Sequence, residues 1–100
     1  MRSINLKPTK QLNLSDFEDK TLIIVDDDDP FRNRLSRAME KKGFRVKEAK
    51  TVEKALEIIR TETTAFAVVD LRLETGNGLD VVKELSKLKK NSRIVMLTGY

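Results

Sequence analysis

The 100-residue sequence contains no cysteine and no histidine. The first absence excludes disulfide bonds and thiolate metal sites. The second removes imidazole ligands and the side chain that most often serves as a general base. Any chemistry in this chain must therefore use carboxylates, hydroxyl groups, lysines and the backbone.

Long apolar segments are also missing. No apolar run approaches the roughly 20 residues of a membrane span, and residues 1–10 lack the apolar centre of a secretory signal. We therefore expect a cytoplasmic protein without a membrane partner. The length predicts one domain, with residues 1–20 as a polar tail and residues 21–100 as the folded part.

Charged residues are abundant, at 36% of the chain, and the net charge is +4. A basic chain can indicate a nucleic-acid partner. Here the basic side chains alternate with apolar positions along predicted helices and lack interleaved aromatic residues. We interpret them as solvated helix faces, without direct nucleic-acid binding. They are Arg32, Arg34, Arg37, Lys41, Lys42, Lys83, Lys87, Lys89 and Lys90.

Short apolar segments alternate with helical patterns in the order βαβαβαβ. Strands are expected at residues 21–25, 44–49, 66–69 and 93–98, and residues 74–78 are expected to form a loop. This order predicts an α/β fold with a parallel sheet and helices on both faces. The charged segment 44–49 is expected at a sheet edge.

Local signals predict where the helices begin and end. Asp29 is expected to cap the first helix, Pro30 to occupy its first position and Gly43 to end it. Thr51 is expected to cap the second helix, and the third is expected to begin at Leu79. The predicted buried positions are Phe31, Leu35, Ala38, Met39, Val52, Ala55, Leu56, Ile59, Val81 or Val82, Leu85 and Leu88.

Polar residues that could bind a ligand or react lie at the ends of three predicted strands. Asp26 and Asp27 follow the first strand, Asp70 follows the third and Thr98 ends the fourth. Ligands of parallel sheets bind beyond the carboxyl ends of strands, so adjacent first and third strands would bring three carboxylates together. Unit charges about 4 Å apart repel by roughly 4 kcal/mol at an effective dielectric near 20, so the cluster needs a proton, a lysine or a cation. Oxygen ligands suit Mg²⁺, and zinc and copper are poor candidates.

Each of these residues also has a purely structural interpretation. The run 26–29 could be an acidic turn favoured by a helix N-terminus, with Asp28 exposed. Asp70 could be a turn residue, and Thr98 an ordinary residue of a strand end. Four consecutive aspartates nevertheless exceed what capping requires, and the combination of positions favours a site.

Taken together, the segments resemble the receiver domain of two-component response regulators. The resemblance covers about residues 20–100, with the motifs in the family's order and at its intervals. Residues 70–74 and 76–79 are most similar to the redox-responding global regulators, whose full chains add a helix-turn-helix output domain. The motifs are Leu22-Ile-Ile-Val-Asp-Asp27, Gly43-Phe44, Ala67-Val-Val-Asp70-Leu-Arg-Leu73, Gly78-Leu79 and Ile94-Val-Met-Leu-Thr-Gly99.

The resemblance implies a flavodoxin-like fold with strand order 2-1-3-4-5. It implies that Asp70 accepts a phosphoryl group from a sensor histidine kinase. Asp26, Asp27 and Asp70 would bind Mg²⁺ together with the backbone carbonyl of Arg72. The hydroxyl of Thr98 would bond the phosphoryl group and couple it to a conformational switch. Such a chain is a signalling module in transcription regulation rather than an enzyme.

Two features depart from the family pattern. Glu74 stands where many receivers have a proline, as in the redox-responding subgroup. A full receiver also continues past the position of Tyr100 with a helix, a fifth strand and a last helix. We therefore expect an incomplete receiver without the fifth-strand lysine and aromatic switch residue. Its fourth strand would be an exposed edge through which the chain self-associates.

Two other readings remain open at this point. The chain could be a truncated structural fragment without signalling activity. It could also be a Mg²⁺-dependent aspartyl phosphatase, although such enzymes need a second acid where this chain has Arg72.

Overall fold

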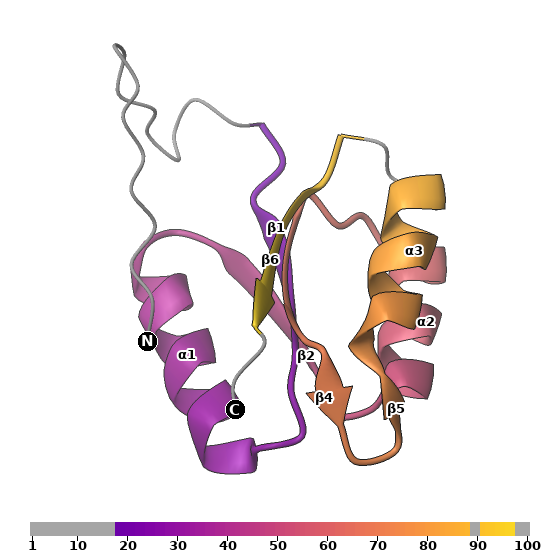
Figure 1. Ribbon diagram of the computed structural model, residues 1–100. Helices are drawn as coiled ribbons and strands as arrows, with labels where there is room; N and C mark the ends of the chain where they lie inside the picture. The colour runs from indigo at the N-terminus through magenta and orange to yellow at the C-terminus, as the bar shows by residue number, and fades with distance from the viewer. Residues whose placement is uncertain (1–17, 89–90, 98–100) are drawn as a thin grey trace, which may run out of the picture.

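The computed structural model describes residues 18–88 and 91–97 of the chain. The main strands are β1 (Thr21–Val25), β2 (Arg45–Ala49), β3 (Phe66–Asp70) and β6 (Arg93–Leu97), and the helices are α1 (Asp29–Lys41), α2 (Val52–Thr61) and α3 (Gly78–Leu88). The four strands form one parallel sheet in the order β2-β1-β3-β6. Helix α1 lies on one face of this sheet, and α2 and α3 lie on the other (Figure 1). The predicted flavodoxin-like parallel sheet is confirmed, with the charged strand β2 at an edge.

The hydrophobic core lies mainly between the sheet and the helices α2 and α3. Strand β1 is central and is buried from Leu22 to Val25, which explains its unbroken apolar run. Val81 and Leu85 of α3 are fully buried, as predicted. Leu88 was predicted to be buried but is 45% exposed, and it is the last residue of α3.

Helix α1 covers its face of the sheet less completely. Its buried residue is Ser36, whereas Phe31, Leu35 and Met39 are only half-buried. Ala38 was predicted on the buried face and is exposed. The apolar side of α1 therefore contacts the sheet along a narrower stripe than the sequence pattern indicates.

The predicted N-cap of α1 was wrong by one residue. The side chain of Asp28 accepts the hydrogen bond from the Phe31 N–H at 3.1 Å and has an extended backbone, so Asp28 is the cap. Asp29 is the first residue of the helix, with Pro30 after it. Pro30 is therefore the second helical residue, whereas it was predicted to be the first. Two other signals are confirmed: Gly43 follows α1 with a φ of 104°, and Thr51 caps α2.

The segment predicted as a loop at 74–78 contains the turn and the second strand of a short hairpin. Strands β4 (Arg72–Leu73) and β5 (Gly76–Asn77) pair antiparallel around a two-residue turn at Glu74 and Thr75. The buried side chain of Leu73 anchors this hairpin on the core. Helix α3 begins at Gly78, one residue earlier than predicted, and the Asn77 side chain accepts the Leu79 N–H at 2.9 Å.

None of the described helices is long and apolar enough to cross a membrane.

Candidate functional site

The carboxyl ends of β1 and β3 place three aspartates together. The two strands are adjacent and parallel, with Val25 opposite Val69, so Asp26 and Asp70 follow at the same level. The chain then turns, because the Asp28 N–H donates to Asp26 Oδ1 at 2.8 Å. This turn replaces the alternation of a continued strand and lets Asp27 join the same side as Asp26.

We call the resulting cluster of Asp26, Asp27 and Asp70 the acidic pocket. One carboxylate oxygen from each residue lies within 4.8 Å of the others. Asp26 is buried, and Asp27 and Asp70 are half-buried. All donors are hard oxygen atoms, and the site is partly open to solvent. This donor set fits a cation such as Mg²⁺, which binds a few carboxylates and keeps part of its water shell.

Burial and neighbouring negative charge act together on Asp26. Burial raises the pKa of its carboxyl above the ordinary value, and the charges of Asp70, Asp27 and Asp28 raise it further. The hydrogen bond from the Asp28 N–H opposes both effects but does not cancel them. The pocket without a cation is therefore electrostatically unfavourable, as expected for carboxylates placed for binding rather than for stability.

The hairpin β4–β5 supplies backbone donors to the other two aspartates. The Arg72 N–H donates to Asp70 Oδ1 at 2.9 Å, and the Glu74 N–H donates to Asp27 Oδ2 at 2.8 Å. These bonds orient both carboxylates, and charged acceptors make them stronger than bonds between neutral groups.

Gly78 allows α3 to begin directly below the end of β3. A Cβ atom at this position would overlap the backbone carbonyl of Asp70 and approach Leu71 Cα to 2.9 Å. The Gly78 N–H donates to the Leu71 carbonyl at 3.3 Å. The close approach therefore fixes the end of β3 that carries Asp70, and only glycine provides the space.

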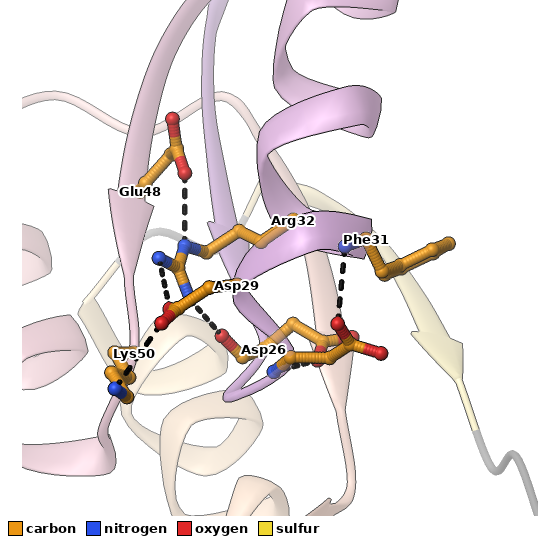
Figure 2. Close-up of polar contacts among 7 residues, drawn as sticks. Asp26, Asp29, Phe31, Arg32, Glu48 and Lys50 are labelled. Atoms are coloured by element: carbon orange, nitrogen blue, oxygen red, sulfur yellow. Dashed lines mark hydrogen bonds and ion pairs between the residues drawn. The ribbon is translucent and has the colours of Figure 1, made fainter.

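Arg32 of α1 forms hydrogen bonds with the residues that follow β1 and with strand β2. Its Nη1 donates to the backbone carbonyl of Asp26 at 2.7 Å, its Nε to Glu48 at 2.9 Å and its Nη2 to Asp29 at 2.7 Å (Figure 2). Only 11% of the Arg32 side chain is exposed. One guanidinium group thus joins α1, β2 and the end of β1 next to the pocket.

Asp29 belongs to this arginine network rather than to the pocket. The hydrogen bond from Arg32 lowers the pKa of Asp29, and the bond from Lys50 Nζ at 3.4 Å lowers it further. The four consecutive aspartates therefore divide their roles: two in the pocket, one as the helix cap and one as the partner of two cations.

The structure brings together three of the residues singled out from the sequence, Asp26, Asp27 and Asp70. Arg72 lies beside them in β4 and bonds Asp70 through its N–H. Thr98 lies outside the described residues. Sequence reasoning missed Arg32 and the Glu74 N–H. The spacing of Asp29 and Arg32 is a signal for an ion pair along a helix, but the bond to the Asp26 carbonyl depends on tertiary structure.

Comparisons with known proteins agree on one family. The family model described as "Response regulator receiver domain" matches residues 22–100. The photosynthetic apparatus regulatory protein RegA of Rhodovulum sulfidophilum is 54% identical over 83 residues, which cover 83% of this chain and 45% of that protein. The acid tolerance regulatory protein ActR of Rhizobium meliloti is 45% identical over 82 residues, which cover 82% of this chain and 42% of that protein. The chain thus spans less than half the length of these relatives.

Solved structures give the same picture. A response regulator from Burkholderia pseudomallei, solved with a phosphorylated aspartic acid and a calcium ion, is 35% identical with a TM-score of 0.78, covering 82% of this chain and 48% of that one. The response regulator TrrA of Thermotoga maritima, solved with Mg²⁺ and BeF, is 28% identical with a TM-score of 0.74, covering 81% of this chain and 70% of that one. The parallel sheet and its helices are therefore those of known receiver structures.

Proposed function

Because the chain belongs to the family of response regulator receiver domains, we propose that it is a phospho-acceptor module of bacterial two-component signalling. Asp70 accepts a phosphoryl group from a sensor histidine kinase in a Mg²⁺-dependent reaction. The module acts in the cytoplasm as part of a transcription regulator and has no catalytic activity on other substrates. It binds neither membranes nor nucleic acid directly.

The observation that carries this proposal is the acidic pocket. Three carboxylate oxygens from the ends of two adjacent strands lie within 4.8 Å of one another, and burial together with the neighbouring carboxylates raises the pKa of Asp26. A pocket of this kind has little structural value on its own. Its geometry supports cation binding next to an aspartate that remains accessible from solvent.

The proposed Mg²⁺ ligands are Asp26, Asp27, Asp70 and the backbone carbonyl of Arg72. When bound, Mg²⁺ would neutralise the carboxylates and lower the repulsion that an incoming phosphoryl group meets. The protein itself holds the carboxylates in place through the Asp28, Arg72 and Glu74 N–H groups. These donors are already in position, so less ordering is needed when the cation binds.

The proposed reaction forms one bond and breaks one. An oxygen of Asp70 attacks the phosphorus of a phosphohistidine on the kinase, and the O–P bond forms as the N–P bond breaks. The electron pair of the broken bond stays on the imidazole nitrogen. The product is an acyl phosphate, and we propose that the Thr98 hydroxyl bonds it and couples it to a conformational switch.

A phosphorylation assay tests the acceptor. The chain is incubated with a small phosphodonor, with and without Mg²⁺, and its intact mass is measured. We expect one labile phosphoryl group that requires Mg²⁺ and is absent from Asp70→Asn. The matched control is Asp80→Asn, an exposed aspartate in the first turn of α3, which should be phosphorylated like the wild type. An adduct that persists in Asp70→Asn contradicts the assignment, and continuous release of phosphate from monoesters would favour a phosphatase.

We also propose that the 100-residue chain self-associates through β6. This strand is at an edge of the sheet that residues 18–88 and 91–97 form, and Val95 and Met96 are 38% and 50% exposed. An apolar edge strand presents backbone donors and acceptors that can pair with a second copy. The central sheet would then continue across the two copies.

A further inference from the structure

The hairpin β4–β5 lies at the end of the sheet where β1 leads into α1 (Figure 1). Its turn residue Glu74 reaches Asp27 through the backbone: the Glu74 N–H donates to Asp27 Oδ2 at 2.8 Å. The two residues are 47 positions apart in the sequence. This bond is therefore a tertiary contact between the loop after β3 and the acidic pocket.

The geometry of the turn allows the Glu74 N–H to be removed without changing the path of the backbone. Glu74 and Thr75 connect the paired residues Leu73 and Gly76, and none of the described non-glycine residues has a positive φ. The turn is thus compatible with type I, in which the position of Glu74 accepts proline without a change of path. Leu73 is already extended in β4, as a residue before proline must be. A proline at position 74 would keep the turn and delete the N–H.

An N–H directed at a carboxylate restrains how that carboxylate rotates. Groups that hydrogen-bond a metal ligand orient it, and their loss typically lowers metal affinity by about tenfold or more. Asp27 is half-buried, so without such a bond its side chain would sample other rotamers and lose more freedom when a cation binds.

We propose that the Glu74 N–H is a positioning group that holds Asp27 in the orientation required for cation binding. This inference rests on the proposed Mg²⁺ site. It also implies that residue 74 sets the cation affinity through its backbone, so a receiver with proline there lacks this contribution.

A comparison of two variants tests the proposal. Glu74→Ala and Glu74→Pro lose the same side-chain charge, but only Glu74→Pro loses the N–H. For each variant the urea midpoint is measured at increasing Mg²⁺, because the gain in stability reports the dissociation constant and the metal-free midpoint is an internal reference. We expect Glu74→Pro to bind Mg²⁺ roughly tenfold more weakly than Glu74→Ala.

The outcomes separate this inference from the proposed function. Equal affinities in the two variants, with Mg²⁺ stabilising the wild type, would overturn the role of the N–H and leave the metal site intact. A wild type whose midpoint does not respond to Mg²⁺ would contradict both.

A second measurement decides the matter if Glu74→Pro does not unfold cooperatively. Hydrogen exchange of the Glu74 amide is followed in the wild type, in Asp27→Ala and in the control Asp80→Ala. The Glu74 amide should exchange faster in Asp27→Ala than in the other two proteins. The same rate in all three would show that Asp27 does not hold this amide and would overturn the proposal.

Discussion

Single residues around the pocket have opposite effects on stability. Asp26 is buried next to two other carboxylates, which is unfavourable when it is ionised. Arg32 donates to the backbone carbonyl of Asp26, whereas its ion pairs are with Asp29 and Glu48 outside the pocket. The protein therefore fixes the backbone of the site firmly while leaving the charge of its carboxylates uncompensated.

The raised pKa of Asp26 predicts how stability depends on pH. Between its pKa in the unfolded chain and its higher pKa in the folded protein, the folded state binds more protons, so stability falls as pH rises. Above the folded pKa the full penalty is present. Asp26→Asn should therefore raise the urea midpoint of the metal-free protein at neutral pH, and the gain should shrink as the pH falls to the ordinary carboxylic-acid range. A lower midpoint for Asp26→Asn at neutral pH would contradict this account.

Substitution of Arg32 should lower the free energy of unfolding of the metal-free protein at neutral pH. Arg32→Ala removes three hydrogen bonds from a side chain that is only 11% exposed, and should cost about 1–3 kcal/mol in the free energy of unfolding. The control is Arg60→Ala, whose ion pair with Glu84 involves an arginine that is 55% exposed and should cost less than about 1 kcal/mol. Urea denaturation measures both. Equal losses would mean that Arg32 is an ordinary surface residue.

Elements of structure position the pocket through their ends. Strands β1 and β3 deliver the aspartates, the β4–β5 hairpin supplies N–H donors, and α3 begins beneath the Asp70 carbonyl. The arrangement depends on glycine where α3 meets β3, because a side chain would occupy space already filled by backbone.

Two glycines at this hairpin should therefore respond differently to alanine. At Gly78 a Cβ atom meets the backbone of Asp70 and Leu71, which cannot move without displacing the pocket. At Gly76 it meets the Val52 side chain, with Cγ2 at 2.8 Å, and not the backbone that carries the pocket. Gly78→Ala should cost about 1–3 kcal/mol of stability, and Gly76→Ala clearly less. Unfolding in urea compares them, and a larger loss for Gly76→Ala would be contrary to this packing.

The sequence predicted the elements better than their ends. Alternating apolar runs located every main strand and helix, because burial on a sheet or helix face imposes a period. It missed the capping role of Asp28, because adjacent aspartates are equivalent until the turn at Asp26 is known. It missed the hairpin as well, since a two-residue strand has no period to detect. The bonds from Arg32 and Glu74 join segments far apart in the chain, which a local pattern does not reveal.

At the scale of the whole molecule, the two edge strands of the sheet differ in character. Strand β2 is an edge with charged side chains, whereas the edge strand β6 exposes Val95 and Met96. Charged edges resist pairing and apolar edges favour it. The two edges of the same sheet therefore have different tendencies to associate.

This difference predicts the oligomeric state of the 100-residue chain. Light scattering coupled to size exclusion should show dimers or larger species at high concentration, and Val95→Lys should shift them to monomer by placing a charge on the β6 edge. The control Val46→Lys adds a charge to β2, at the opposite edge, and should leave the oligomeric state unchanged. A wild type that remains monomeric at high concentration would contradict the proposal.

The most direct test of the central claim is to identify the phosphorylated residue. After incubation with a phosphodonor and Mg²⁺, an acyl phosphate is reduced by borohydride, which converts the modified aspartate to homoserine, and peptide mass spectrometry locates it. We expect one converted residue, Asp70, and none when Mg²⁺ is omitted. Conversion at Asp26, Asp27 or another acidic residue, or equal conversion without Mg²⁺, would contradict it.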